Sequence, residues 1–417
     1  MSDLSLSRPA TLSAASAQRA FALCATTLLA AIFLQKIALP GTGGLFPLNL
    51  FIFPAVTLLA FSTGLLEVNQ PAFFWYTLFV AAGAVSMAVS PSAHVSVLSL
   101  GFLLVVQFPL MFRLLPTELS YDRVLKFLST VGCICALLGC VQFAAQFIFG
   151  ARVAFFLDTG IPDAVAVKQF NSMIPLYWTS PVFKSNGIFF LEPSFFCQFV
   201  AVAVVAELLV GPRTLRLIVL AAGLISSYSG TGLSMLALFV PFHFLRHGHV
   251  RLFVIAAIFS LTLIFFGDAI SIDALTRRTA EFSNEQSSGW ARFLSMFNLL
   301  QNVIFANDFT FLAGRGPGTV QEHFQQLSYS AFDPTWGKII YEYGLIGSVI
   351  YAVFFYFAFF KGAKGLRFAM GYTYLFLGGY LLNASILMQM AALVVWVGQE
   401  AVTSSAARLR DPNPAPA

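Results

Sequence analysis

Long apolar runs alternate with short polar segments along most of the chain. About 20 helical residues cross the roughly 30 Å hydrocarbon layer of a bilayer, so each run predicts a membrane-spanning helix. The predicted spans lie at about 20–38, 45–66, 71–89, 96–115, 124–149, 187–210, 214–229, 231–246, 250–268 and 338–360.

A last apolar stretch, 368–399, is too long for one span and only just long enough for two. Gly378, Gly379 and Asn383 predict a break inside it. We therefore expect two short spans, near 368–383 and 385–399. This gives twelve spans in total, with eleven as the alternative.

The composition agrees with this pattern. Of the 417 residues, 58% are hydrophobic and only 10% are charged, which leaves too little charge to cover a soluble protein of this size. Helices satisfy their own backbone hydrogen bonds in lipid, so an all-α fold is expected. The chain is predicted to be a polytopic membrane protein with one membrane domain, 1–417.

Basic residues test the orientation, because cytoplasmic loops are enriched in Lys and Arg. With the N-terminal tail (1–19) and the C-terminal tail (400–417) both inside, 14 of the 23 basic residues lie on inner segments. They are Arg8, Arg19, Arg113, Arg123, Lys126, Arg213, Arg216, Arg246, Arg251, Lys361, Lys364, Arg367, Arg408 and Arg410. The N-terminal tail lacks a secretory signal pattern, so the first helix is expected to stay as an anchor, and the C-terminal tail is predicted to be disordered.

Two long outer loops, 150–186 and 269–337, are rich in aromatic residues and are therefore expected to be ordered. The second loop predicts an amphipathic helix against the membrane face, because apolar residues recur there at helical spacing. That stripe comprises Trp290, Phe293, Phe297, Leu300 and Ile304, and Ser288 is positioned to cap the helix.

One carboxylate stands out at the start of a predicted span. Glu192 precedes Pro193 in NGIFFLEPSFF, and proline favours the first position of a helix. Glu192 is therefore expected near the helix cap at the outer mouth, where ionisable residues often mark function. A structural cap, or an ion pair with Lys184, is the alternative explanation.

The second outer loop also carries four arginines: Arg277, Arg278, Arg292 and Arg315. Six acidic residues accompany them, so the loop has a net charge of −2 and any anion site must use individual arginines. Arg292 lies off the apolar stripe of the amphipathic helix, where its guanidinium is able to clamp a phosphate with two hydrogen bonds. A solvated helix face is the alternative.

Three further motifs bring polar groups to the outer boundary. The segment GRGPGT (314–319) is a glycine-rich loop that is able to offer backbone N–H groups to an anion, although a plain turn explains it equally well. In SYSGTG (227–232), Ser229 and Thr231 are candidate donors to sugar or phosphate oxygens. Tyr341 and Glu342 begin the span after the second loop, where Glu342 is expected to pair with an arginine or to face the same cavity as Glu192.

A metal centre or a bound cofactor is not expected. The five cysteines all lie in apolar segments without the spacing of a zinc site or a CxxC pair. The five histidines are equally sparse, and three of them lie in a charge cluster at a helix end.

Together these pieces resemble the Wzy-type O-antigen and exopolysaccharide polymerases, a superfamily that also contains the O-antigen ligases. The closest matches are NGIFFLEPSFF, SGTG, SSGWARF, GRGPGT and YEYGLIG, and the first of these is similar to a xanthan-type exopolysaccharide polymerase. Ligases carry a His-Asn pair ahead of the last motif. Asp333 and Pro334 occupy those positions here, which weakens the ligase interpretation.

The resemblance implies a GT-C-like glycosyltransferase in the bacterial inner membrane, with periplasmic loops at 150–186 and 269–337. It implies transfer of glycan from undecaprenyl diphosphate to a sugar hydroxyl, without a required metal. Membrane lipid, a flippase and a chain-length regulator are the implied partners, and nucleic acid is not one. Glu192 and Arg292 are the expected catalytic residues. The substrate-binding candidates are Arg315, Arg277, Arg278, Lys184, Ser229, Thr231, Tyr341 and Glu342.

Two alternatives remain open. An O-antigen ligase uses the same donor with a lipid A-core acceptor. A transporter of lipid-linked oligosaccharide usually shows charged or broken segments near the middle of several helices, often in repeated halves. Here the ionisable residues gather at the outer boundary, and no repeat is evident.

Overall fold

The computed structural model describes residues 14–92, 94–115, 119–168, 170–177, 179–246, 290–291, 294–325 and 332–397. Most of these residues are helical. The main helices are α1 (Ala14–Phe33), α2 (Asn49–Ser62), α3 (Gln70–Val89), α4 (Val97–Gln107), α5 (Tyr121–Phe149), α8 (Pro193–Val210), α9 (Thr214–Ser226), α10 (Gly230–Arg246), α17 (Thr335–Phe355), α18 (Arg367–Phe376) and α19 (Ala384–Met390). Shorter helical segments are η1 (Phe108–Met111), α6 (Ala151–Ala154), α7 (Phe156–Gly160), α14 (Ser295–Leu299), η4 (Leu300–Ile304), α15 (Asp308–Ala313), α16 (Thr319–Gln325), η5 (Tyr356–Phe360) and η6 (Ala391–Val395).

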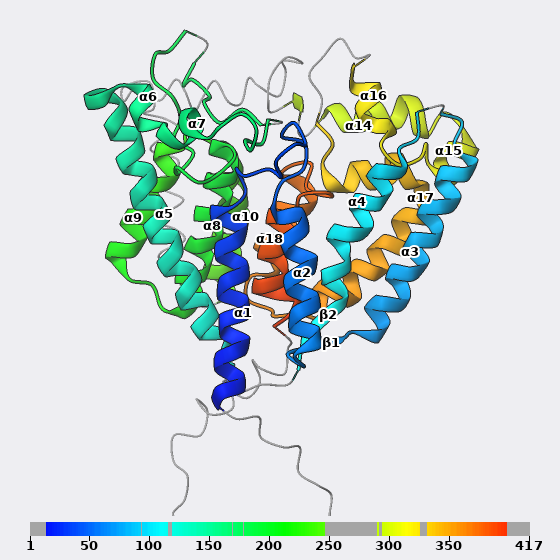
Figure 1. Cartoon of the computed structure of the whole chain (residues 1–417), viewed down its shortest axis with the longest axis horizontal. Helices are drawn as coiled ribbons and strands as arrows, with labels where there is room; N and C mark the ends of the chain where they lie inside the picture. The colour runs from blue at the N-terminus through cyan, green and yellow to red at the C-terminus, as the bar shows by residue number, and fades with distance from the viewer. Residues whose placement is uncertain are drawn as a thin grey trace, which may run out of the picture.

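The main helices form two groups with a central layer between them (Figure 1). In one group, α5 packs against α8 and α9, and α8 also packs against α10. In the other, α17 packs along α3, and α15 covers part of α17. The central layer contains α1, α2, α18 and α19, with α1 packed on α19 and its continuation η6.

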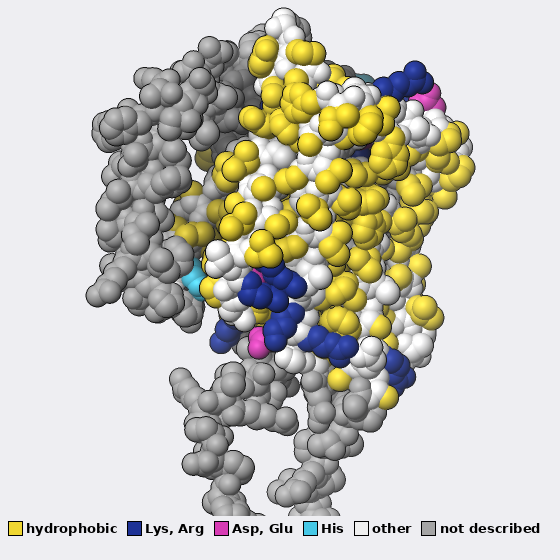
Figure 2. Space-filling model, turned by 90° about the vertical axis from the view of Figure 1, so that its left-hand side faces the viewer, with side chains coloured by type: hydrophobic (Ala, Val, Ile, Leu, Met, Phe, Trp, Pro, Cys, Tyr) yellow, Lys and Arg dark blue, Asp and Glu magenta, His cyan; other side chains and the backbone are white. Residues whose placement is uncertain are grey.

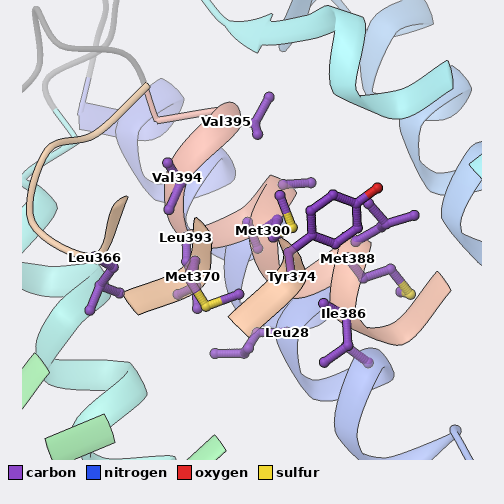
Figure 3. Packing of buried hydrophobic residues seen from close by; sticks show 14 of the residues in the cluster. Leu28, Leu366, Met370, Tyr374, Ile386, Met388, Met390, Leu393, Val394 and Val395 are labelled. Carbon is purple, nitrogen blue, oxygen red and sulfur yellow. The ribbon is translucent and has the colours of Figure 1, made fainter. Parts of the chain in front are cut away.

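The centre of the core is built around α19 and η6. Every residue from Ala384 to Val395 is buried, and Leu28 of α1 and Met370 and Tyr374 of α18 pack into the same cluster (Figure 3). A helix that is apolar all round is typical of the interior of a membrane bundle. The last apolar stretch of the chain therefore forms the middle of the protein.

Five described helices are long and apolar enough to cross a membrane, and five shorter apolar helices accompany them. The long ones are α1, α3, α5, α8 and the helical stretch from Thr335 to Phe360. The structure thus supports a mostly helical membrane protein. The count of twelve spans stays a prediction, and the predicted span at 250–268 lies outside the described residues.

The fold is mostly helical, as expected, and the described residues also contain one small sheet. Strands β1 (Leu66–Val68) and β2 (Phe112–Leu114) form an antiparallel pair, with Glu67 opposite Arg113. The Arg113 guanidinium donates to the Glu67 carboxylate at 2.7 Å. The apolar runs predicted at 45–66 and 96–115 therefore end in extended backbone, because Leu66 and Leu114 are buried in the pair while Arg113 is exposed.

Local sequence signals place several helix ends correctly. Helix α8 begins at Pro193, as its fixed backbone angle predicts. The break in the last apolar stretch is confirmed, because Asn383 caps α19 by accepting from the Ile386 N–H at 3.1 Å.

The amphipathic segment of the second outer loop is helical through α14 and η4. Its buried side chains differ from the predicted stripe. Met296 and Leu299 are buried together with Leu300 and Ile304, whereas Phe297 is 58% exposed and its ring packs on Trp336 at 4.8 Å. The prediction is therefore right at Leu300 and Ile304 and wrong at Phe297. Contact of this segment with the membrane face stays a prediction.

Close packing of the first group depends on small residues. A Cβ built on Gly223 of α9 would lie 2.6 Å from the Cβ of Ala136 on α5, and 2.9 Å from its Cα. Small residues allow such close approach of membrane helices, so we expect Gly223→Leu to push α9 away from α5. The expected loss is about 1–3 kcal/mol of stability, seen as a lower melting temperature of the purified protein in detergent.

Gly101→Leu is the matched control. Gly101 lies inside α4, and a Cβ there has no heavy atom within 4 Å. Both variants gain the same helix propensity, so the difference between their melting temperatures measures packing alone. Equal melting temperatures for the two variants would contradict the close contact of α5 and α9.

Candidate functional site

The candidate residues lie at one edge of the molecule, which we call the loop edge. It carries the segments 34–48, 150–192 and 305–318, at the top of Figure 1. The opposite edge, the basic edge, includes the start of α5 and the turn from α8 to α9, with Arg123, Lys126, Arg213 and Arg216. Figure 2 shows Lys and Arg side chains gathered near the lower end of one face, below a largely hydrophobic surface. Which edge faces the cytoplasm stays a prediction.

Glu192 lies at the end of the loop that leads into α8. Its backbone is extended and its side chain is partly exposed. The carboxylate accepts a hydrogen bond from Ser194 Oγ at 3.0 Å and a long one from the Asn171 N–H at 3.4 Å. It makes no capping bond to the first N–H groups of α8. A structural cap therefore does not explain this carboxylate.

The motif around Glu192 meets the SGTG turn that opens α10. Thr231 Oγ1 donates to the Ser194 carbonyl at 3.3 Å and lies 3.1 Å from Ser229 Oγ. Gly232 is packed so closely against the Cys197 carbonyl that a side chain there would overlap it. The structure thus joins two of the motifs singled out in the sequence. Thr231 is buried in this contact, whereas Ser229 is partly exposed.

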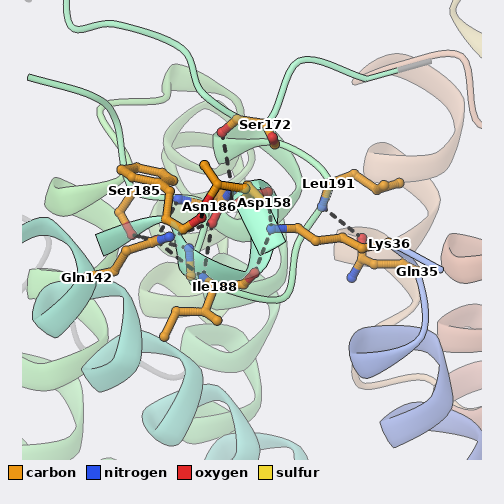
Figure 4. Close-up of polar contacts among 12 residues, drawn as sticks. Gln35, Lys36, Gln142, Asp158, Ser172, Ser185, Asn186, Ile188 and Leu191 are labelled. Atoms are coloured by element: carbon orange, nitrogen blue, oxygen red, sulfur yellow. Dashed lines mark hydrogen bonds and ion pairs between the residues drawn. The ribbon is translucent and has the colours of Figure 1, made fainter. Parts of the chain in front are cut away.

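A buried polar network, missed by the sequence analysis, lies beside the segment that leads to Glu192 (Figure 4). The Lys36 ammonium donates to Asp158 Oδ1 and to the Ile188 carbonyl, both at 2.6 Å. Asp158 Oδ2 accepts from the Asn186 amide at 3.0 Å, and that amide in turn meets Gln142 at 2.9 Å. Lys36 is only 6% exposed. Burial lowers the pKa of Lys36, and the Asp158 carboxylate opposes that shift.

The sequence held one signal for this network, which was a pair of opposite charges on two outer loops. Lys36 is the basic residue of the short first outer loop, and Asp158 belongs to the first long outer loop. The two loops also pair through their backbones. The Ala38 N–H donates to the Val165 carbonyl at 2.7 Å, and Ile37 pairs with Ala166.

A second polar cluster lies where α17 is broken. Lys338 and Glu342 are buried, and the Lys338 ammonium lies 2.9 Å from Asp333 and 3.8 Å from Glu342. Glu342 therefore pairs with a lysine, and the expected pairing with an arginine is not what the described residues show. Tyr341 is also buried, in a small cluster with Met296 and Leu300.

The GRGPGT loop wraps around this break. The N–H groups of Arg315 and Gly316 donate to the carbonyls of Tyr341 and Glu342, at 3.0 and 2.9 Å. The Gly318 N–H donates to the Glu342 carboxylate at 2.9 Å. Gly344, with φ of 63°, breaks the helix at the point where the loop crosses it. The loop does bind an anion through its backbone, but that anion is the chain's own carboxylate.

Arg315 is the candidate arginine that the structure describes. Its side chain is partly exposed, and its carbonyl accepts a hydrogen bond from Ser90 at the end of α3. Burial lowers the pKa of the neighbouring His323, and the Arg315 guanidinium lowers it further, so this imidazole is neutral at pH 7. Among the described residues, no carboxylate forms an ion pair with Arg315.

The turn between α18 and α19 contacts both α8 and the residues just before α17. The Tyr380 ring packs on Phe195 at 5.3 Å, in the first turn of α8, and its hydroxyl donates to Gln198 at 2.7 Å. The next residue back, Gly379, lies so close to Asp333 that a Cβ would stand 2.6 Å from its carboxylate. This turn therefore lies against the helix that follows Glu192 and against Asp333 of the second polar cluster.

Four candidate residues remain to be placed. Arg277, Arg278 and Arg292 lie outside the described residues. Lys184 is partly exposed, and its backbone N–H donates to the Ile174 carbonyl at 2.8 Å. Within the described part of the chain, no group of three or more His, Cys, Asp or Glu side chains has the arrangement of a metal site.

Comparison of the chain with models of protein families, with curated proteins and with solved structures found no match. Its function must therefore be inferred from its own residues and contacts.

Proposed function

We propose that the protein is a membrane glycosyltransferase of the Wzy polymerase type. It transfers a glycan from undecaprenyl diphosphate to the hydroxyl of an incoming lipid-linked repeat unit, on the outer face of the bacterial inner membrane. The observation that carries the proposal is the state of Glu192. This carboxylate is partly exposed at the loop edge, is not used as a helix cap, and is held by the contact between two motifs of that family.

Glu192 acts as the base in this mechanism. The acceptor hydroxyl oxygen attacks the anomeric carbon of the donor glycan while the bond from that carbon to the diphosphate oxygen breaks. The proton of the hydroxyl passes to Glu192, and the diphosphate leaves as an anion. A general base has to lie within hydrogen-bonding distance of the proton that it accepts, and a carboxylate at the mouth of the bundle meets a sugar there. Attack opposite the leaving group inverts the anomeric centre.

Arginines stabilise the leaving diphosphate in place of a metal. Arg292 is the proposed principal residue, with Arg315 as its described helper and Arg277 or Arg278 as further contacts. Support comes from Arg315, whose guanidinium is partly exposed at the loop edge and is not neutralised by a described carboxylate. A guanidinium placed where negative charge develops stabilises a transition state strongly.

We expect Glu192→Gln to lower the rate of polymerisation by about 10²–10⁴-fold, because glutamine cannot accept the proton. The measurement is the length and amount of polymer in a strain that lacks the native copy, followed by the rate with purified protein and lipid-linked repeat units. Glu322→Gln is the control, since Glu322 is also a partly exposed carboxylate at the loop edge and has no role in the proposal.

Arg292→Ala should lower the rate by about 10²–10³-fold and Arg315→Ala by less, because each removes positive charge from the leaving diphosphate. Arg113→Ala, at the basic edge, is the control. Unchanged polymer in both Glu192→Gln and Arg292→Ala would contradict the proposal. A product joined to a lipid A core in place of longer lipid-linked chains would identify a ligase. In a strain that lacks the protein, lipid-linked single units should accumulate on the outer face, and their absence from that face would identify a transporter instead.

Removal of divalent cations tests the role given to the arginines. We expect purified protein treated with EDTA to keep its activity, because guanidinium groups carry the charge stabilisation. Complete loss that Mg²⁺ restores would replace the arginines with a metal ion in the mechanism.

A further inference from the structure

The segment that carries Glu192 holds an unusual backbone conformation just before it. Ile188 has φ of 67°, and Gly187 before it has φ of 64°. The left-handed region suits glycine, but it strains a β-branched residue. Such a conformation persists only where the surroundings hold it, so the contacts of Ile188 are informative.

Both ends of the Ile188 peptide unit are held by buried side chains. Its N–H is shared between Gln142 Oε1 at 3.2 Å and Asn186 Oδ1 at 3.1 Å. Its carbonyl accepts from the Lys36 ammonium at 2.6 Å. Because Lys36 also binds Asp158, and Asp158 binds Asn186, these groups close a ring around Ile188 (Figure 4).

The same loop holds the chain again next to Glu192. Gln35, the neighbour of Lys36, accepts a hydrogen bond from the Leu191 N–H at 3.3 Å through its side-chain oxygen. Lys36 therefore holds the segment at Ile188, and Gln35 holds it at Leu191, which directly precedes Glu192. Gln35 and Lys36, which follow α1, thus hold the backbone that places the Glu192 carboxylate at the start of α8.

We propose that Lys36, paired with Asp158, is a positioning residue for Glu192. Lys36 does not touch the reacting groups. It holds the Ile188 carbonyl, fixes the left-handed turn, and so sets the place of the Glu192 carboxylate. This inference rests on the proposed function only for its effect on rate, because the effect on the 186–192 segment is measurable without any reaction.

The first experiment is independent of activity. Hydrogen exchange of the purified protein in detergent is measured for wild-type, Lys36→Met and Lys168→Met chains. Lys168→Met is the matched control, because Lys168 forms an exposed ion pair with Asp163 at 3.5 Å. We expect faster exchange of the peptide spanning 186–192 in Lys36→Met, with unchanged exchange in α8 beyond it. Unaltered exchange of 186–192 in a folded Lys36→Met protein would overturn the proposal.

Loss of one partner leaves a buried charge without its ion pair, so Lys36→Met is also at risk of misfolding. The double variant Lys36→Met/Asp158→Leu removes both charges, and such replacements often leave stability unchanged or improved. The Ile188 carbonyl still loses its donor. We expect a melting temperature close to wild type together with fast exchange of 186–192. If residues 186–192 exchanged at the wild-type rate in this folded double variant, the Lys36–Asp158 pair would have no positioning role.

The rate measurement links the turn to Glu192. We expect the double variant to lower kcat by about 10²-fold, as a small misplacement of a catalytic group does, with KM little changed. In the Glu192→Gln background the same change should have almost no further effect, because Lys36 acts through Glu192. Multiplying effects would overturn the positioning role. Full activity of Glu192→Gln would instead defeat the proposed function and leave the exchange result standing.

Discussion

The structure depends on one constraint of the bilayer, which is that backbone polar groups in hydrocarbon need partners within the protein. Regular helices meet this constraint by themselves, and every interruption has to be satisfied by another part of the chain. At the break in α17, the Glu342 carbonyl accepts from Ser86 of α3 at 2.7 Å and from Gly316 of the crossing loop. At the approach to α8, side chains of Gln142 and Lys36 satisfy the Ile188 peptide unit. Each polar cluster at the loop edge thus satisfies backbone groups outside regular helix, at the α17 break and in the segment that leads into α8.

This constraint also explains how much could be predicted from the chain alone. The apolar runs indicated most of the described helices, and Pro193 and Asn383 marked two boundaries, because these signals are local. The Lys36–Asp158 pair joins residues 122 positions apart, and no periodic pattern announces such a contact. The small sheet was missed for a similar reason, since its two strands are the ends of apolar runs that each resemble a helix. The amphipathic stripe was right at Leu300 and Ile304 but wrong at Phe297, because contact of that ring with Trp336 of α17 is not visible in the local pattern.

For the candidate site, the structure leaves Glu192 partly exposed and joins its motif to the SGTG turn, a contact that the sequence did not predict. Sequence and structure differ on the glycine-rich loop. Its amides looked available for a substrate phosphate, yet three of them are bonded to Tyr341 and Glu342. A carboxylate 24 residues further along the chain occupies the place that a phosphate would take. Any diphosphate therefore has to be met by side chains, which leaves the arginines as the groups that matter in the proposed mechanism.

The half-length helices at the centre have a consequence for the surrounding lipid. Helix α18 has 10 residues, so it rises only about 15 Å, half the thickness of a typical hydrocarbon layer. Helix α5, in one of the two flanking groups, has 29 residues and is long enough to cross with tilt. Hydrophobic mismatch of this kind is relieved by thinning the bilayer or by filling the missing depth with protein, at a modest cost for each ångström. Because α18 lies in the central layer between the two groups of helices, protein rather than lipid fills the missing depth beside it.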